Sequence, residues 1–139
     1  MRFKTLMALA LMSTVVAALA PDGEDGDADY TVNLATTDAL GTFLVDGEGM
    51  TLYSFANDVP GSETSACSGE CAEKWPVFFA QEILVPPELN KTDFQGFLRD
   101  DGSIQTTYKG WPLYYYFEDE AAGDAKGQGL GDVWYVVSP

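Results

Sequence analysis

The sequence predicts an all-β domain, a small antiparallel sandwich or partly closed barrel. We expect it to be built from two pseudo-symmetric hairpin repeats, with one or two short helical turns. Three observations support this prediction. From Tyr30 onward, short apolar or alternating runs are separated by turn residues, helix signals are few, and the chain repeats itself at a spacing of 61 positions. A length of 139 residues suits one domain of this kind.

The first half contains three expected strands. Residues 30–35 alternate in part between apolar and polar side chains, and residues 41–45 form a short apolar run. Two glycines within residues 46–49 mark a turn. Residues 51–55 then alternate, with Thr51, Tyr53 and Phe55 on one face. This pattern predicts strands joined by tight turns.

The second half contains three more. Residues 104–108 resemble a short strand that turns at Lys109 and Gly110. Residues 112–117 are apolar or aromatic on both faces, which predicts a central strand covered on each side. Residues 133–137 form the last expected strand.

Helical turns are expected at two places only. Residues 70–75 can form one or two turns, which Pro76 would stop. Residues 87–90 can form another, with proline at the first position.

The internal repeat covers about residues 40–76 and 101–137. Each copy reads Gly-(Ser/Thr)-apolar, then a glycine turn, then x-Leu-Tyr-x-aromatic-x-x-Asp. The repeated unit is therefore a hairpin whose second strand ends at an aspartate. The aligned pairs are Gly41 and Gly102, Thr42 and Ser103, Phe43 and Ile104, Gly49 and Gly110, Leu52 and Leu113, Tyr53 and Tyr114, Phe55 and Tyr116, and Asp58 and Asp119.

The N-terminal region predicts export. Residues 1–20 begin with basic side chains, continue with an apolar run too short to span a bilayer, and end in the small-x-small pattern Ala18-Leu-Ala20 of a signal peptide. An acidic leader, residues 21–29, is expected to be disordered, and residues 30–139 form the single β domain. No cysteine comes directly after the apolar run, where a lipid would be attached. We therefore expect a periplasmic or extracellular protein without a lipid anchor or membrane span.

Composition excludes several function classes. The chain has no histidine, which excludes Ser-His-Asp and Cys-His catalysis and imidazole metal sites. Removal of residues 1–20 leaves five basic and 22 acidic side chains, a formal charge of −17. Such a charge repels phosphate backbones, so we expect no nucleic-acid partner.

The two cysteines, Cys67 and Cys71, predict a disulfide, because an even number in an exported chain is typical of a structural bridge. Gly69 gives the short loop between them the freedom to bring the two sulfurs together. The alternative is a redox pair, but the spacing is one residue longer than Cys-x-x-Cys and no thioredoxin-like βαβ pattern surrounds it.

The chain resembles the bacterial and archaeal family of predicted lipoproteins with a Tyr-x-(Phe/Trp/Tyr)-x-x-Asp motif, also called the secreted repeat of unknown function. Residues 53–58 and 114–119 each fit that motif. The further matches are Thr51-Leu-Tyr53, Cys67-Ser-Gly-Glu-Cys71-Ala with Trp75-Pro76, Gly110-Trp-Pro-Leu-Tyr114, Gly123-Asp124 with Gly127-Gln-Gly129, and Trp134-Tyr-Val-Val137. The resemblance covers about residues 31–139 and implies the fold and the exported compartment, with no activity attached.

The motif residues are the sharpest site candidates, namely Tyr53, Phe55, Asp58, Tyr114, Tyr116 and Asp119. Asp58 and Asp119 end equivalent strands. One interpretation is a pair of calcium sites, since Ca²⁺ takes carboxylate oxygens from loops. The favoured interpretation is that each aspartate accepts backbone N–H bonds and fixes its turn. A separate hypothesis, tied to no particular residues, is that two of the 22 acidic side chains form an acid and base pair for glycan cleavage.

The function predicted from these observations is an exported, non-catalytic domain that binds a small ligand, an ion or an envelope protein. The alternatives are a carboxylate-dependent hydrolase and a calcium-binding module. No cofactor is expected, and calcium is the one ion considered. Most of the aromatic side chains are expected in the core, where they dominate small β domains, and the alternative is a stacking platform for a sugar.

Overall fold

The computed structural model describes residues 29–139. The predicted signal peptide and nearly all of the acidic leader lie outside the described residues. The all-β prediction is confirmed, because short antiparallel strands dominate and the described residues form no closed barrel. The strands are β1 (Val32–Thr37), β2 (Gly41–Asp46), β3 (Tyr53–Phe55), β4 (Phe94–Leu98), β5 (Ile104–Tyr108), β6 (Trp111–Pro112) and β7 (Trp134–Val136).

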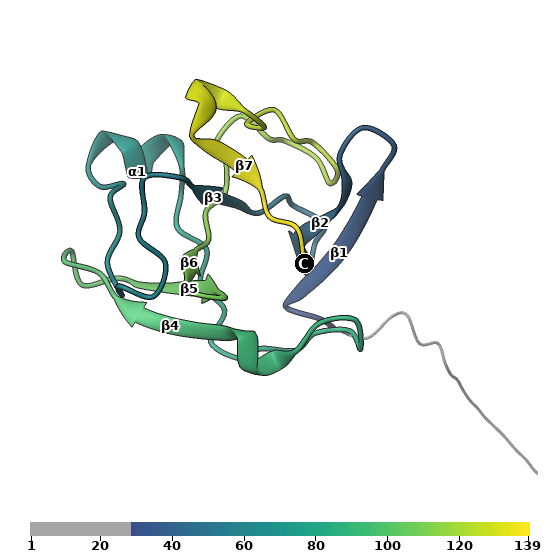
Figure 1. Ribbon diagram of the computed structural model, residues 1–139, viewed down its shortest axis with the longest axis horizontal. Helices are drawn as coiled ribbons and strands as arrows, with labels where there is room; N and C mark the ends of the chain where they lie inside the picture. The colour runs from purple at the N-terminus through teal and green to yellow at the C-terminus, as the bar shows by residue number, and fades with distance from the viewer. Residues whose placement is uncertain (1–28) are drawn as a thin grey trace, which may run out of the picture.

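Three small sheets are joined by single bridges. β1 pairs with β2, β3 with β7, and β4 with β5 and β6, all antiparallel. Figure 1 shows the β1–β2 hairpin and the helix α1 (Glu70–Lys74) at opposite ends of the molecule, with β3 and β7 between them. Within residues 29–139, no helix has the length and apolar character needed to cross a membrane.

The two repeats exchange strands. Tyr53 and Tyr114 bond to each other through both backbone groups, N to O at 2.8 and 2.9 Å, so an approximate twofold axis passes between them. β3 of the first repeat pairs with β7 of the second, and Tyr114 of the second repeat bridges to Val77 of the first. Each repeat therefore completes a sheet of the other.

The apolar core has two clusters that draw on both repeats. One contains the aliphatic side chains Leu44, Leu52 and Leu113 with Phe78 and Val137, all buried. The other is aromatic and surrounds the twofold axis; its buried members are Tyr53, Phe55, Cys67, Trp75, Tyr114 and Trp134.

The backbone register corrects part of the sequence alignment. Leu44 N donates to Val137 O and Thr106 N donates to Phe78 O, at 2.8 and 2.9 Å, which makes Leu44 and Thr106 equivalent. Before the turn, the structural offset is therefore 62 rather than 61, and Phe43 corresponds to buried Gln105 rather than to exposed Ile104.

The length of the hairpin turn explains this shift. Five residues separate the bridged pair Val45 and Thr51, whereas four separate Thr107 and Pro112. With the offset of 62, β1 corresponds to β4, so the structural repeat includes a strand before each of the segments 40–76 and 101–137.

Three local expectations need correction. β4 was not expected, since Gly96 lies at its centre and weakens the strand signal. The central strand expected at 112–117 is wrong, because only β6 and bridges at Tyr114 are strand-like, and Phe117 is 51% exposed. The helical turn expected at 87–90 lies instead at η2 (Lys91–Asp93), where the Asn90 side chain accepts from Thr92 N and caps it.

The remaining short helices follow local signals. α1 confirms the turn expected at 70–75, and Trp75, just before Pro76, ends it. A second 3₁₀ turn, η3 (Leu130–Asp132), follows the glycine-rich segment 123–129 and leads into β7.

Candidate functional site

The motif tyrosines and aspartates meet across the twofold axis rather than within one motif. The Tyr53 hydroxyl donates to Asp119 Oδ2 at 2.7 Å, and the Tyr114 hydroxyl donates to Asp58 Oδ2 at 2.7 Å. Each tyrosine therefore satisfies the aspartate of the other repeat. The motif forms two crossed braces that tie the repeats together.

The second oxygen of each aspartate holds its own loop. Ala66 N donates to Asp58 Oδ1 at 2.6 Å, and Lys126 N donates to Asp119 Oδ1 at 2.9 Å. Each of the four carboxylate oxygens of Asp58 and Asp119 thus accepts a hydrogen bond from another group of the protein. Within residues 29–139, no group of three or more acidic or cysteine side chains lies close enough to hold a metal ion.

The motif aromatics form the ends of a four-ring stack. Trp75 and Trp134 stack across the axis with ring centroids 3.8 Å apart and planes within 4°. Phe55 stacks on Trp134 at 4.2 Å, and Tyr116 lies against Trp75 at 4.3 Å. Tyr53 and Trp75 form a T-shaped pair, and Tyr114 and Trp134 form the equivalent T-shaped pair on the other side of the axis. Phe55, Trp75 and Trp134 are buried in the core, and Tyr116 at the end of the stack is partly buried.

Burial separates the two braces. Asp58 is 5% exposed, and burial raises its pKa, although bonds from Ala66 N and the Tyr114 hydroxyl favour the ionised form. Asp119 is half-buried. Burial also raises the pKa of the Tyr53 and Tyr114 hydroxyls well above the usual range, so both remain protonated donors.

The disulfide between Cys67 and Cys71 is confirmed, with an S–S distance of 2.03 Å. Cys67 is fully buried and joins the aromatic cluster, while the Cys71 backbone N–H bonds to Ser68 O at the start of α1. The bridge spans residues 67–71 and begins directly after Ala66, whose N–H donates to Asp58. In the second repeat the residue after the equivalent donor, Lys126, is Gly127, so this repeat has no corresponding disulfide.

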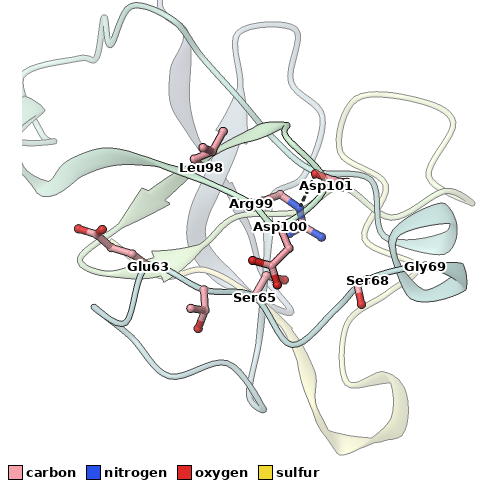
Figure 2. A pocket seen from close by; sticks show the side chains of 9 residues that line it. Glu63, Ser65, Ser68, Gly69, Leu98, Arg99, Asp100 and Asp101 are labelled. Atoms are coloured by element: carbon pink, nitrogen blue, oxygen red, sulfur yellow. Dashed lines mark ion pairs between the residues drawn. The ribbon is translucent and has the colours of Figure 1, made fainter.

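A pocket of about 340 Å³ opens beside this loop. Figure 2 shows its lining, which comes from the loop before α1 and from the tip of the β4–β5 hairpin. The lining residues are Glu63, Thr64, Ser65, Ser68, Gly69, Leu98, Arg99, Asp100 and Asp101. It contains three carboxylates and no aromatic ring.

Arg99 links the two walls of the pocket. Its Nη1 donates to Gln105 Oε1 and its Nη2 to Cys67 O, both at 2.6 Å. Although Arg99 is only 7% exposed, its Nε has no hydrogen-bond acceptor among the described residues, and the nearest carboxylate oxygen, on Asp101, is 4.0 Å away. Gln105, fully buried, is held in turn by a bond from its Nε2 to Leu113 O at 2.8 Å.

The sequence analysis did not single out Arg99 or Gln105. The signal that could have found them is the position of Gln105, a polar residue where the first repeat has the apolar Phe43. The one-residue shift in the alignment concealed it, since Phe43 was paired with Ile104.

Comparison with known proteins agrees with this architecture. A family model described as a secreted repeat of unknown function matches residues 34–78 and 97–138. The first matched segment runs from within β1 to just past the bridge residue Val77, and the second from within β4 to just past β7. No curated protein and no solved structure matches the chain. The chain belongs to this family of secreted repeats, and it is an exported protein.

Proposed function

We propose that this protein is an exported, non-catalytic binding domain whose ligand site is the pocket beside Arg99. The observation that carries the proposal is that the pocket lies where the two repeats differ. The features that the two repeats share, the crossed Tyr–Asp hydrogen bonds and the ring stack, instead join the repeats to each other.

The shared features support a bracing role for the motif. Tyr53, Tyr114, Asp58 and Asp119 satisfy one another and two backbone N–H groups. A carboxylate that already accepts two short hydrogen bonds offers little to a ligand or metal ion. These contacts favour the turn-fixing interpretation of the aspartates over the calcium module.

The unshared features point to the pocket. Register places Arg99 at the position of Thr37, and Gln105 at the position of Phe43. A buried arginine and a buried glutamine are costly because both must be desolvated, and the first repeat has the apolar Phe43 where the second has Gln105. Local departures from an otherwise consistent pattern are concentrated at functional sites.

Binding rather than catalysis fits the groups present. The chain has no histidine, and both cysteines are joined in the disulfide. The three pocket carboxylates favour a hydrolase as the second candidate, since paired carboxylates can act as acid and base. The aromatic stack lies in the core, which leaves a sugar without a stacking surface in this pocket.

The experiment is amide-shift mapping by two-dimensional NMR with four probes: acetate, methylammonium, glucose and L-leucine. We expect at least one probe to shift the amides of Ser65, Ser68 and Asp100. The amide of Asp38, at the equivalent tip of the β1–β2 hairpin, is the internal control. If no probe shifts the pocket amides, the proposal is wrong. Probe turnover, for example release of sugar from an aryl glycoside, would favour the hydrolase instead.

A further inference from the structure

We infer that the ligand of this pocket is a small zwitterion with an aliphatic side chain, of the chemistry of a free α-amino acid. The inference rests on the proposed function and specifies its ligand class. It follows from two sets of side chains in the pocket lining, Arg99 and the exposed carboxylates, which suit opposite charges and which we call its basic and acidic ends.

The first end is Arg99. A guanidinium carries five N–H donors, and hydrogen bonds are accounted for at only two of them, to Gln105 and to Cys67 O. The buried Nε lacks an acceptor, and the Asp101 carboxylate is beyond hydrogen-bond distance. Because a guanidinium matches a carboxylate in geometry and charge, we assign the carboxylate of the ligand to this end of the pocket.

The second end is acidic. Glu63 and Asp100 are exposed, and the described residues provide neither a hydrogen bond nor an ion pair to their carboxylates. Asp101 differs, since it already accepts from the backbone and the hydroxyl of Ser103. The acceptors left at Glu63 and Asp100 suit an ammonium group.

Other ligand classes meet only one end. A simple anion is repelled by three lining carboxylates and by the formal charge of −15 of the whole chain. A simple cation leaves the Arg99 Nε without an acceptor. A sugar finds no aromatic surface. A zwitterion satisfies both ends, and a volume of about 340 Å³ admits a ligand of amino-acid size.

Leu98 adds the apolar contact. It lines the pocket and is 69% exposed. An aliphatic side chain on the ligand would cover it, so that both gain by removal from water.

The test compares L-leucine with two analogues that each lack one charge, N-acetyl-L-leucine and L-leucinamide. Affinities are measured by calorimetry, and the binding position by the same amide shifts. We expect each analogue to bind at least about tenfold more weakly than leucine, because each leaves one end of the pocket unpaired. Equal affinity for leucine and leucinamide would overturn the role of Arg99, and equal affinity for N-acetyl-leucine that of the carboxylates.

Variants locate the effect. Asp100→Asn and Glu63→Gln should each weaken leucine binding about three- to tenfold, since each removes one exposed charge partner. Asp38→Asn, at the equivalent hairpin tip, is the matched control and should leave the affinity unchanged. Arg99→Gln, which removes the positive charge, should abolish the preference for leucine over leucinamide. If that variant does not fold, the analogue series on the parent protein decides the same point.

The outcomes separate the two proposals. Glucose, acetate or methylammonium bound in the pocket in preference to leucine would overturn the zwitterion and leave the binding function standing. The absence of any shift in the pocket with all probes would overturn both.

Discussion

The brace formed by Asp58 and Tyr114 lies in an environment unlike that of its twofold mate, formed by Asp119 and Tyr53. The first is buried, sits beside Arg99 and is followed by a loop that a disulfide closes. The second is half-buried and is followed by a segment with four glycines between residues 123 and 131. The same six-residue motif therefore makes the same hydrogen bonds in two settings, and the pocket beside Arg99 lies in the first of them.

The comparison separates scaffold from site. What the two repeats share is the crossed hydrogen bonding and the symmetric ring stack. What only one side possesses is the network from Cys67 O through Arg99 to Gln105. In a duplicated fold, the parts that both repeats share indicate what the fold requires, and the parts that one repeat alone has indicate a candidate binding site.

The largest expected effect comes from removing one tyrosine hydroxyl. Tyr114→Phe should lower the free energy of unfolding by about 3 kcal/mol, because it leaves a buried carboxylate oxygen of Asp58 without its donor. Tyr53→Phe should cost less, about 2 kcal/mol, since water can reach the half-buried Asp119 although the buried Gly127 N–H also loses its acceptor. Urea unfolding measures both. Equal losses would show that the two environments do not differ energetically.

Gly127 lies in the glycine-rich segment 123–131, at the position that Cys67 of the disulfide occupies in the first repeat. A Cβ at this position would lie 2.7 and 2.9 Å from two carbon atoms of the Trp75 ring, which the stack prevents from moving. Gly127→Ala should therefore cost about 2–3 kcal/mol by overpacking. Gly96→Ala is the control, because its Cβ would meet Ile104 Cγ2 at 3.6 Å and Gln105 O at 3.8 Å, both ordinary contacts. Similar thermal stability of the two variants would contradict the close contact.

Reduction of the disulfide should affect the first brace alone. The loop it closes is short, with a sequence separation of 4. Chain entropy for such a loop predicts a loss of about 2 kcal/mol. Hydrogen exchange should rise at Ala66 N, which bonds to Asp58, and stay constant at Lys126 N, which bonds to Asp119. Equal acceleration at both amides would mean that the repeats open together.

The smallest expected effect is on pH dependence. Burial raises the pKa of Asp58 above that of the unfolded chain. The stability linked to its protonated form is therefore fully present below the unfolded pKa, near 4, and lost as the pH rises through the higher folded value. Relative to Asp58→Asn, the parent protein should lose stability from about pH 4 upward. Thermal unfolding of both proteins between acid and neutral pH measures this, and parallel curves would contradict it.

The sequence by itself determined the local features of this protein. Alternation and turns predicted an all-β fold, the spacing of Cys67 and Cys71 predicted their bridge, and the paired motifs predicted the family. Each of these signals lies within a few neighbouring residues, or in a direct comparison of two segments. Local physical chemistry is enough for such features.

Only the tertiary structure decided how the repeats combine. Tyr114 bonds to an aspartate 56 positions away and Tyr53 to one 66 positions away, so neither partner can be inferred from its own motif. Arg99 becomes a site residue because one turn is a residue shorter and places Gln105 in the core beneath it. Partnerships of this kind depend on which strands are exchanged across the twofold axis, and this exchange is set by the burial of both repeats together.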